Sequence, residues 1–162
     1  MRYLSLAVLA GMVVSACGTS SSAPTSPSPT SATSLTGTWS GTSADSTGQE
    51  NMIWTVTQSG TTMTGTMSFS DTGRGMMGTG SMRGTVNGRT VTFHMDIPNG
   101  GFSGMMASCS MGMDGQGMMS DDGRTMTGTY SGNMAGMMSG GMMNQTQSCG
   151  SAMNNGQFTL TR

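Results

Sequence analysis

The sequence has no lysine, a single histidine and very little charge. Six arginines oppose seven acidic residues, and charged residues make up 8% of the chain. A protein that binds nucleic acid needs a basic surface, which this composition does not provide. After residue 16 there is also no apolar run near the roughly 20 residues that a membrane-spanning helix requires. We therefore expect neither a nucleic-acid partner nor a transmembrane helix.

Ordinary core residues are scarce as well. From residue 35 onward, leucine, isoleucine, valine and phenylalanine together number eleven, a shortage that in a highly charged chain indicates disorder. The same stretch contains twenty methionines and carries almost no net charge. Because methionine is apolar and fills irregular gaps, we expect a folded domain whose core contains many methionines.

Signatures of enzyme chemistry are missing too. The sequence has no Gly-x-Ser-x-Gly elbow, no phosphate-binding loop and no HExxH motif. His94 is followed two residues later by Asp96, and on a strand this pair would share a face, as a general base and its orienting carboxylate do. A solvent-exposed histidine beside an aspartate is the more ordinary interpretation. We therefore expect no enzymatic activity.

The start of the chain has the order of features found in an export signal. Arg2 precedes an apolar run, residues 4–14, which ends in the small residues Ser15 and Ala16. Val14-Ser15-Ala16-Cys17 resembles the lipobox of bacterial lipoproteins. The resemblance implies a signal peptide over residues 1–16, cleavage before Cys17 and lipidation of that cysteine. An ordinary signal peptide that happens to end in cysteine is the alternative.

Lipidation predicts an address in the cell envelope. Two or more acyl chains make membrane attachment effectively permanent, and Gly18 replaces the aspartate that retains lipoproteins at the inner membrane, so we expect the outer membrane, facing either periplasm or exterior. Residues 17–34 consist of the lipidated cysteine and a Ser/Thr/Pro-rich segment without charge. Such a composition is typical of a disordered tether.

Residues 35–162 read as a single all-β domain. Glycine and β-branched threonine recur, and apolar residues alternate with polar ones, as in strands with one buried face. Asn87-Gly88 is a strong hairpin signal. Further turns are expected at Ser59-Gly60, Asp122-Gly123 and Asn155-Gly156.

A short phrase, Met-x-Gly-Thr-apolar, recurs at residues 63–67, 82–86 and 126–130. Glycine within a strand permits a sharp bend or close packing, so its repetition favours a small, strongly curled sheet. We expect an antiparallel up-and-down barrel of about eight strands, with a β-sandwich as the alternative.

The domain also resembles a known group of proteins. The motifs are Gly37-Thr38-Trp39 at the first strand, Gln58-Ser59-Gly60, and residues 126–130 and 156–162. They resemble those of bacterial lipoproteins with small lipocalin- or avidin-like barrels. The resemblance implies this fold and an envelope location but no activity, and the ligand-binding residues of lipocalins and avidins have no match in this sequence.

Two cysteines remain after Cys17. In an oxidising compartment, Cys109 and Cys149 are expected to form a disulfide. Closing a loop of about 40 residues stabilises the fold by on the order of 4 kcal/mol on the chain-entropy model. No CxxC motif points to thiol redox chemistry.

The placement of the methionines leaves three interpretations open. Met52, Met63, Met67, Met82, Met95, Met126 and Met106 fit alternating strand positions, whereas the others lie in Gly- and Ser-rich stretches expected to be loops. Thioethers in loops suit Cu(I) or Ag(I), with His94 as a further ligand. Oxidant scavenging and simple packing are the alternatives. The candidate metal ligands are Met111, Met113, Met134, Met137, Met138, Met142 and Met143.

The sequence as a whole predicts a lipid-anchored envelope protein with a non-catalytic binding or structural role. The first alternative is Cu(I) or Ag(I) binding through methionine-rich loops. The second is an apolar ligand inside the barrel. This last hypothesis predicts a cavity, whereas a barrel filled by methionine predicts none.

Overall fold

The computed structural model describes residues 34–46, 48–103, 106–138, 147–149 and 153–162. The predicted signal peptide, Cys17 and nearly all of the predicted linker lie outside these residues. The described part of the chain is built from strands and turns. It contains no helix long and apolar enough to cross a membrane.

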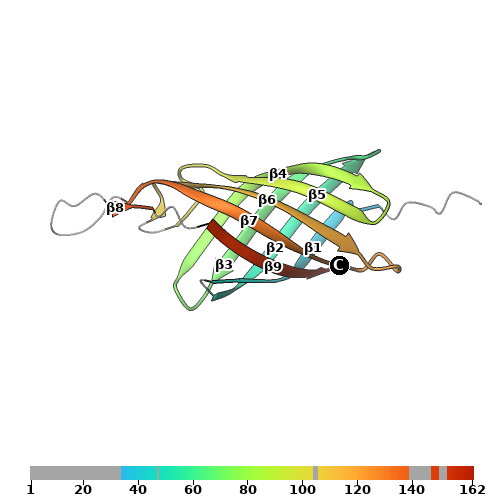
Figure 1. The fold of residues 1–162 in the computed structure, drawn as a ribbon, viewed down its shortest axis with the longest axis horizontal. Coiled ribbons are helices and arrows are strands. Elements are labelled where there is room, and N and C mark those ends of the chain that lie inside the picture. The colour runs from blue at the N-terminus through green and yellow to red at the C-terminus, as the bar shows by residue number, and fades with distance from the viewer. Residues whose placement is uncertain (1–33, 47, 104–105, 139–146, 150–152) are drawn as a thin grey trace, which may run out of the picture. The chain divides into compact units, whose positions relative to one another are not determined.

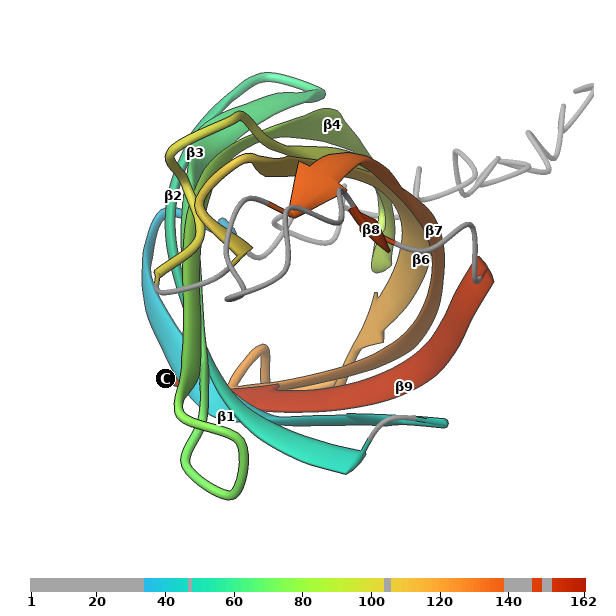
Figure 2. The same ribbon diagram turned by 90° about the vertical axis from the view of Figure 1, so that its left-hand side faces the viewer.

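Eight long strands form a closed antiparallel barrel, and a ninth segment adds a short extension (Figure 1). Strands β1 to β7 each pair with the next along the chain, and β9 closes the ring between β7 and β1. Figure 2 shows this ring along the barrel axis. The predicted barrel is confirmed, and the sandwich is not formed. The strands are β1 Gly37–Asp45, β2 Gly48–Ser59, β3 Thr62–Asp71, β4 Met76–Asn87, β5 Thr90–Ile97, β6 Cys109–Met119, β7 Thr125–Met138, β8 Gln147–Ser148 and β9 Met153–Thr161.

Three of the four predicted turns join consecutive strands. Gly60, Gly88 and Gly123 have φ angles of 59°, 60° and 66°, the left-handed conformation that glycine adopts without strain. The fourth prediction, Asn155-Gly156, is wrong because both residues lie within β9. Gly156 pairs with Tyr130 of β7, and a Cβ atom at Gly156 would overlap the tyrosine ring. The glycine therefore makes room for a side chain.

Methionine supplies much of the barrel interior. Six of the predicted core methionines are buried, and Met106 packs half-buried against the core. The expectation that the remaining methionines occupy loops is wrong for most of those described. Met111 and Met113 are buried on β6, and Met134, Met137 and Met138 belong to β7. A strand buries every second residue, so Met111-Gly112-Met113 directs both thioethers inward.

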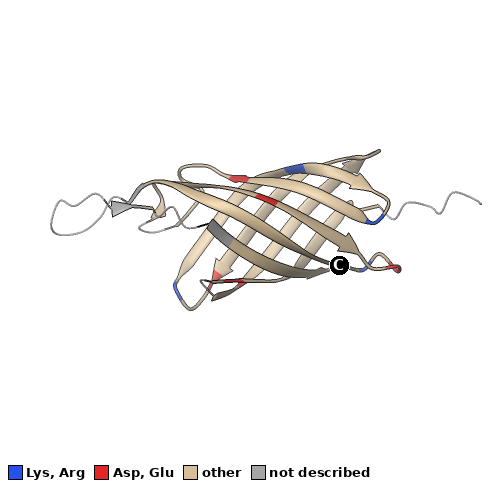
Figure 3. Cartoon of the chain, in the orientation of Figure 1, with Lys and Arg blue, Asp and Glu red and all other residues tan. Residues whose placement is uncertain are grey.

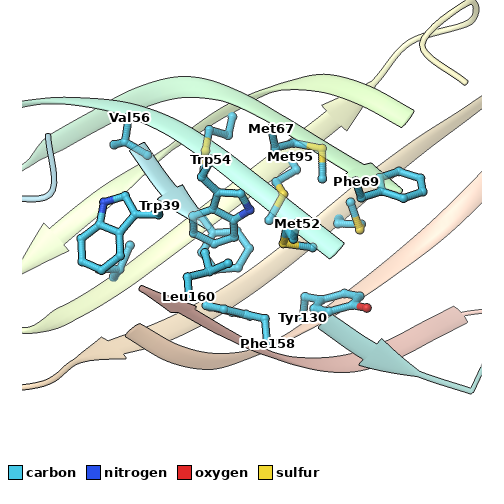
Figure 4. Packing of buried hydrophobic residues seen from close by; sticks show 14 of the residues in the cluster. Trp39, Met52, Trp54, Val56, Met67, Phe69, Met95, Tyr130, Phe158 and Leu160 are labelled. Carbon is cyan, nitrogen blue, oxygen red and sulfur yellow. The ribbon is translucent and has the colours of Figure 1, made fainter. Parts of the chain in front are cut away.

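Three aromatic rings occupy the middle of the barrel (Figure 4). The ring centroid of Trp54 lies 4.9 Å from that of Phe93 and 5.1 Å from that of Phe158, and the two phenylalanines are 5.6 Å apart. Inward glycines make space for these rings: a Cβ atom at Gly128 would lie 2.6 Å from ring carbons of Phe158. This explains the glycine of the phrase at residues 126–130.

One end of the barrel is closed by Leu35 and Trp39, both fully buried. The Trp39 Nε1–H donates to the Leu35 carbonyl at 2.8 Å. The Arg162 guanidinium lies 5.0 Å from the centre of the Trp39 ring and donates to the Ser34 carbonyl at 2.6 Å. The barrel core, this closure and the disulfide all come from residues 34–162, so the barrel is self-contained.

Candidate functional site

A cavity of about 260 Å³ lies at the barrel end opposite Trp39. Its walls come from six strands, β1 to β4, β6 and β7, together with Arg74 and Cys149. The segment between β5 and β6 also lines it, and in Figure 2 this segment bends in over this end of the ring. The lining is mainly apolar, with Phe69 and Phe102 among the thioethers. The seven methionines that line it are Met52, Met67, Met76, Met106, Met111, Met113 and Met134.

Two segments at the rim of this cavity are attached to the barrel. The first is attached by a disulfide and a backbone hydrogen bond. Cys109, the first residue of β6, forms a disulfide with Cys149, and their Cα atoms are 5.9 Å apart. The Cys149 amide also donates to the Gly136 carbonyl at 3.0 Å. The predicted disulfide is confirmed, and Cys149 itself lines the cavity. The bond therefore fixes part of the cavity wall.

A second attachment holds the β5–β6 segment against β4. The Thr79 amide donates to the Gly101 carbonyl at 2.8 Å, and the Ser103 amide donates to the Met77 carbonyl at 2.9 Å. Between these bonds, Phe102 is buried and its ring packs edge-on against Phe69 at 5.9 Å. The backbone bonds thus hold an aromatic side chain in the cavity wall.

The cavity mouth is acidic. Asp45 and Glu50 line it from β1 and β2, and the Tyr130 hydroxyl donates to Asp45 Oδ2 in a long hydrogen bond of 3.5 Å. Asp71, at the end of β3, accepts from the Gly73 and Arg74 amides at 2.8 and 3.1 Å. Its other oxygen lies 3.8 Å from Arg74 Nε. Asp71 thus pairs with Arg74, which is itself part of the cavity lining.

The Glu50 carboxyl group holds its proton unusually strongly. Partial burial raises its pKa most, and the negative charges of Asp45 and Asp71 raise it further, from the ordinary 4.5 to about 7. The pKa of the Tyr130 hydroxyl is also raised, chiefly by burial and then by Asp45. Near neutral pH, Glu50 therefore exists as a mixture of neutral and charged forms.

The raised pKa of Glu50 makes stability depend on pH. An acid whose pKa is higher in the folded than in the unfolded state favours folding below the unfolded value, and this contribution disappears as pH rises through the folded value. Between about pH 4.5 and 7, we expect the free energy of unfolding of the unmodified barrel to fall by about 1–2 kcal/mol more than that of the Glu50→Gln variant. This figure is discounted because solvent reaches the carboxyl group and screens its charge. Urea denaturation of both proteins across this range measures the difference. Identical pH profiles would contradict the assignment.

Behind the cavity lining lies a buried hydrogen-bond donor without an acceptor. Trp54 is fully buried, and within the described residues its Nε1–H has no hydrogen-bond partner. In Figure 4 the indole nitrogen lies on the edge of the ring that faces Met52, and Met52 lines the cavity. Because a buried donor without a partner is unfavourable, an acceptor reaching this point would satisfy it.

The predicted metal ligands are only partly brought together. Met111, Met113 and Met134 line one wall of the cavity. Met137 and Met138 lie at the end of β7, paired with β8, and Met142 and Met143 fall outside the described residues. Within the described ranges, no group of three or more His, Cys, Asp or Glu side chains is placed to hold a metal ion.

His94 lies on the barrel wall, away from the cavity lining. Its Nδ1 atom is 2.7 Å from Asp114 Oδ1 on the neighbouring strand β6, whereas the sequence pattern pointed to Asp96 on its own strand. Charged residues are sparse on this wall (Figure 3). The outer side of the sheet is instead rich in hydroxyl groups, such as the Thr85 and Thr92 Oγ1 atoms, which are 2.7 Å apart.

Sequence reasoning missed the polar half of the site. Asp45 and Glu50 lie on either side of a hairpin and were not distinguished from other surface acids, and Tyr130 was noted only as part of a repeated phrase. Comparisons with protein-family models, curated proteins and solved structures find no match to this chain. The resemblance to lipocalin- and avidin-like lipoproteins therefore stays a prediction.

Proposed function

We propose that this protein binds a small, mainly apolar molecule in the cavity at the acidic end of the barrel, without catalysing a reaction on it. The observation that carries this proposal is the 260 Å³ cavity lined by seven methionines. The methionine-filled interior predicted no cavity, whereas an apolar ligand inside the barrel predicted one. The fold contains both a packed interior and a cavity, because the aromatic rings fill the middle of the barrel and leave the cavity at the end opposite Trp39.

The size of the cavity limits the ligand. An apolar cavity of about 150 Å³ accommodates benzene, so 260 Å³ corresponds to about ten non-hydrogen atoms on the same scale. Methionine side chains have flexible torsions and a polarisable sulfur, so such walls adapt to ligands of different shape. We infer a preference for small aromatic or branched aliphatic molecules.

The proposed location follows from the first part of the sequence. Val14-Ser15-Ala16-Cys17 supports lipidation of Cys17, and residues 17–34 have the composition of a spacer. We therefore place ligand binding at the outer membrane, with the barrel tethered through Cys17 and facing either the periplasm or the exterior.

Blocking the cavity should abolish binding. We expect 2-phenylethanol, which has nine non-hydrogen atoms, to bind the isolated barrel in isothermal titration calorimetry with a negative heat-capacity change. Met134→Trp places a large ring in the cavity wall and should eliminate the binding heat. Met118→Trp changes a 53%-exposed methionine and should leave it unchanged. Equal binding by both variants would place the ligand elsewhere and refute the proposal.

Soft-metal binding is a second candidate function, supported by one specific arrangement. Met111 and Met134 are directly opposite each other across β6 and β7, and Met113 lies two residues further along the same face of β6. Side chains at opposite positions of antiparallel strands approach closely. Thioethers are suitable ligands for Cu(I) and, by chemical analogy, for Ag(I).

The metal hypothesis is tested by volume-conserving substitutions. Leucine at Met111, Met113 and Met134 keeps the packing but removes the sulfur ligands. In an anaerobic Cu(I) titration against a chromophoric chelator, this triple variant should lose the stoichiometric binding of the unmodified barrel. A triple leucine variant at Met63, Met82 and Met126, which are outside the cavity lining, should retain it. Failure of the unmodified barrel to compete with the chelator would eliminate this candidate.

A further inference from the structure

We propose that the ligand is a small primary ammonium cation, whose charged group is held by Glu50 and Asp45 while its apolar body contacts the methionine wall. This inference rests on the proposed function and adds the chemical class of the ligand.

Negative charge is concentrated at the mouth. Asp45, Glu50 and Asp71 are three of the seven acidic residues in the chain, and the charges of Asp45 and Asp71 both act on Glu50. Arg74 also lines the cavity, but it is ion-paired with Asp71, so these two charges offset each other and leave Asp45 and Glu50 as the net negative charge. A carboxylate or phosphate ligand would therefore be repelled, whereas a cation would relieve the repulsion among the acids.

The carboxylates and the apolar wall belong to the same interior surface. Glu50 precedes Met52 by two residues on β2, so both side chains face the inside of the barrel, and both line the cavity. Ionised carboxylates only accept hydrogen bonds, and Tyr130 donates to Asp45. An ammonium group brings three further donors. It can contact the mouth while the rest of the ligand lies against Met52.

A second observation, independent of the acids, is a buried hydrogen-bond donor directly behind the apolar wall. The Trp54 Nε1–H is fully buried, has no partner within the described residues and is directed toward Met52 (Figure 4). Trp54 itself does not line the cavity, but Met52, toward which the donor points, does. A ligand with its ammonium group at the mouth and an electron-rich end beside Met52 is compatible with both observations.

Matched probes separate this inference from the proposed function. The barrel, residues 31–162, is titrated at pH 8 with 2-phenylethylamine, which is protonated there, and with 2-phenylethanol, which has the same size and no charge. We expect the amine to bind about tenfold to a hundredfold more tightly, because hydrogen bonds to ionised groups are stronger than those between neutral groups. If neither probe binds, the proposed function fails. If both bind with equal affinity, the proposed function stands and the ammonium inference is wrong.

Variants at the cavity mouth then identify the side chain that distinguishes the amine from the alcohol. Glu50→Gln should remove most of the preference for the amine and leave the affinity for the alcohol unchanged. Asp45→Asn, which keeps a hydrogen-bond acceptor for Tyr130, should reduce the preference in the same direction. Asp121→Asn, which alters an exposed ion pair with Arg89, is the matched control and should bind like the unmodified barrel. A preference retained in both mouth variants would overturn the inference.

The pH dependence gives a further readout. The charged or titratable groups that face Glu50 are Asp45 on β1, Asp71 at the end of β3, Arg74 in the turn between β3 and β4, and Tyr130 on β7, which lies near Asp45. As pH rises from 6 to 8, Glu50 loses its proton, and we expect the affinity for the amine to rise by about tenfold. The affinity for the alcohol should change little. A pH-independent preference for the amine would exclude Glu50 as the discriminating group.

Discussion

Replacing Trp54 by alanine is expected to lower the free energy of unfolding by about 3–5 kcal/mol, the range for removing a large buried aromatic side chain. Trp54 is fully buried and contacts both Phe93 and Phe158 at centroid distances near 5 Å. Its removal deletes two ring contacts and leaves an empty space. Because the strands are closed into a barrel, they cannot easily move inward to fill it. Urea denaturation followed by circular dichroism measures the effect.

The neighbouring residue provides the matched control. Ile53 is on the same strand but faces outward and is 47% exposed, so Ile53→Ala should change the unfolding free energy by less than about 0.5 kcal/mol. Comparable losses for the two variants would mean that the interior is not organised around the tryptophan.

Removing the disulfide is the second change with a large expected effect. Cys109 and Cys149 are separated by 40 residues, and the chain-entropy model gives about 4 kcal/mol for a loop of this length. We expect the double variant Cys109→Ala, Cys149→Ala to be less stable by about 3–4 kcal/mol. Thermal denaturation and urea denaturation both report this change.

Reduction supplies the control for the disulfide. Adding a thiol reductant should destabilise the unmodified barrel by a similar amount and leave the double variant unaffected. Because Cys149 also lines the cavity, ligand affinity should fall together with stability in the double variant. A double variant as stable as the unmodified barrel would show that the small apolar core does not need the disulfide, which would contradict this expectation.

The sequence was sufficient to predict the barrel because its alternation is regular. Outward threonines and inward apolar residues specify which face of each strand is buried, and Gly60, Gly88 and Gly123 form turns that only a few residue types adopt easily. The turn predicted at Asn155-Gly156 was wrong for a reason that local sequence does not contain. Its glycine is required by Tyr130 on the neighbouring strand.

The candidate site was less predictable. The sequence predicts Met111 and Met113 as ligands from their close spacing, and Met134 from its place in a glycine-rich stretch. Alternation with glycine is also how a tightly packed strand fits large side chains into a narrow barrel. The acidic mouth depends on register. Tyr130 is brought to Asp45 across 85 residues of sequence, and no short motif encodes such a contact.

Methyl NMR of the barrel labelled with 13C at its methionine methyl groups tests the central claim most directly. On addition of 2-phenylethanol, we expect shifts for Met52, Met67, Met111 and Met113, which line the cavity, and none for Met63 and Met126, which are buried outside its lining. Shifts confined to the cavity methionines, with nuclear Overhauser contacts to the probe, are the predicted result. Uniform shifts, or none at saturating probe, would contradict ligand binding at this end of the barrel.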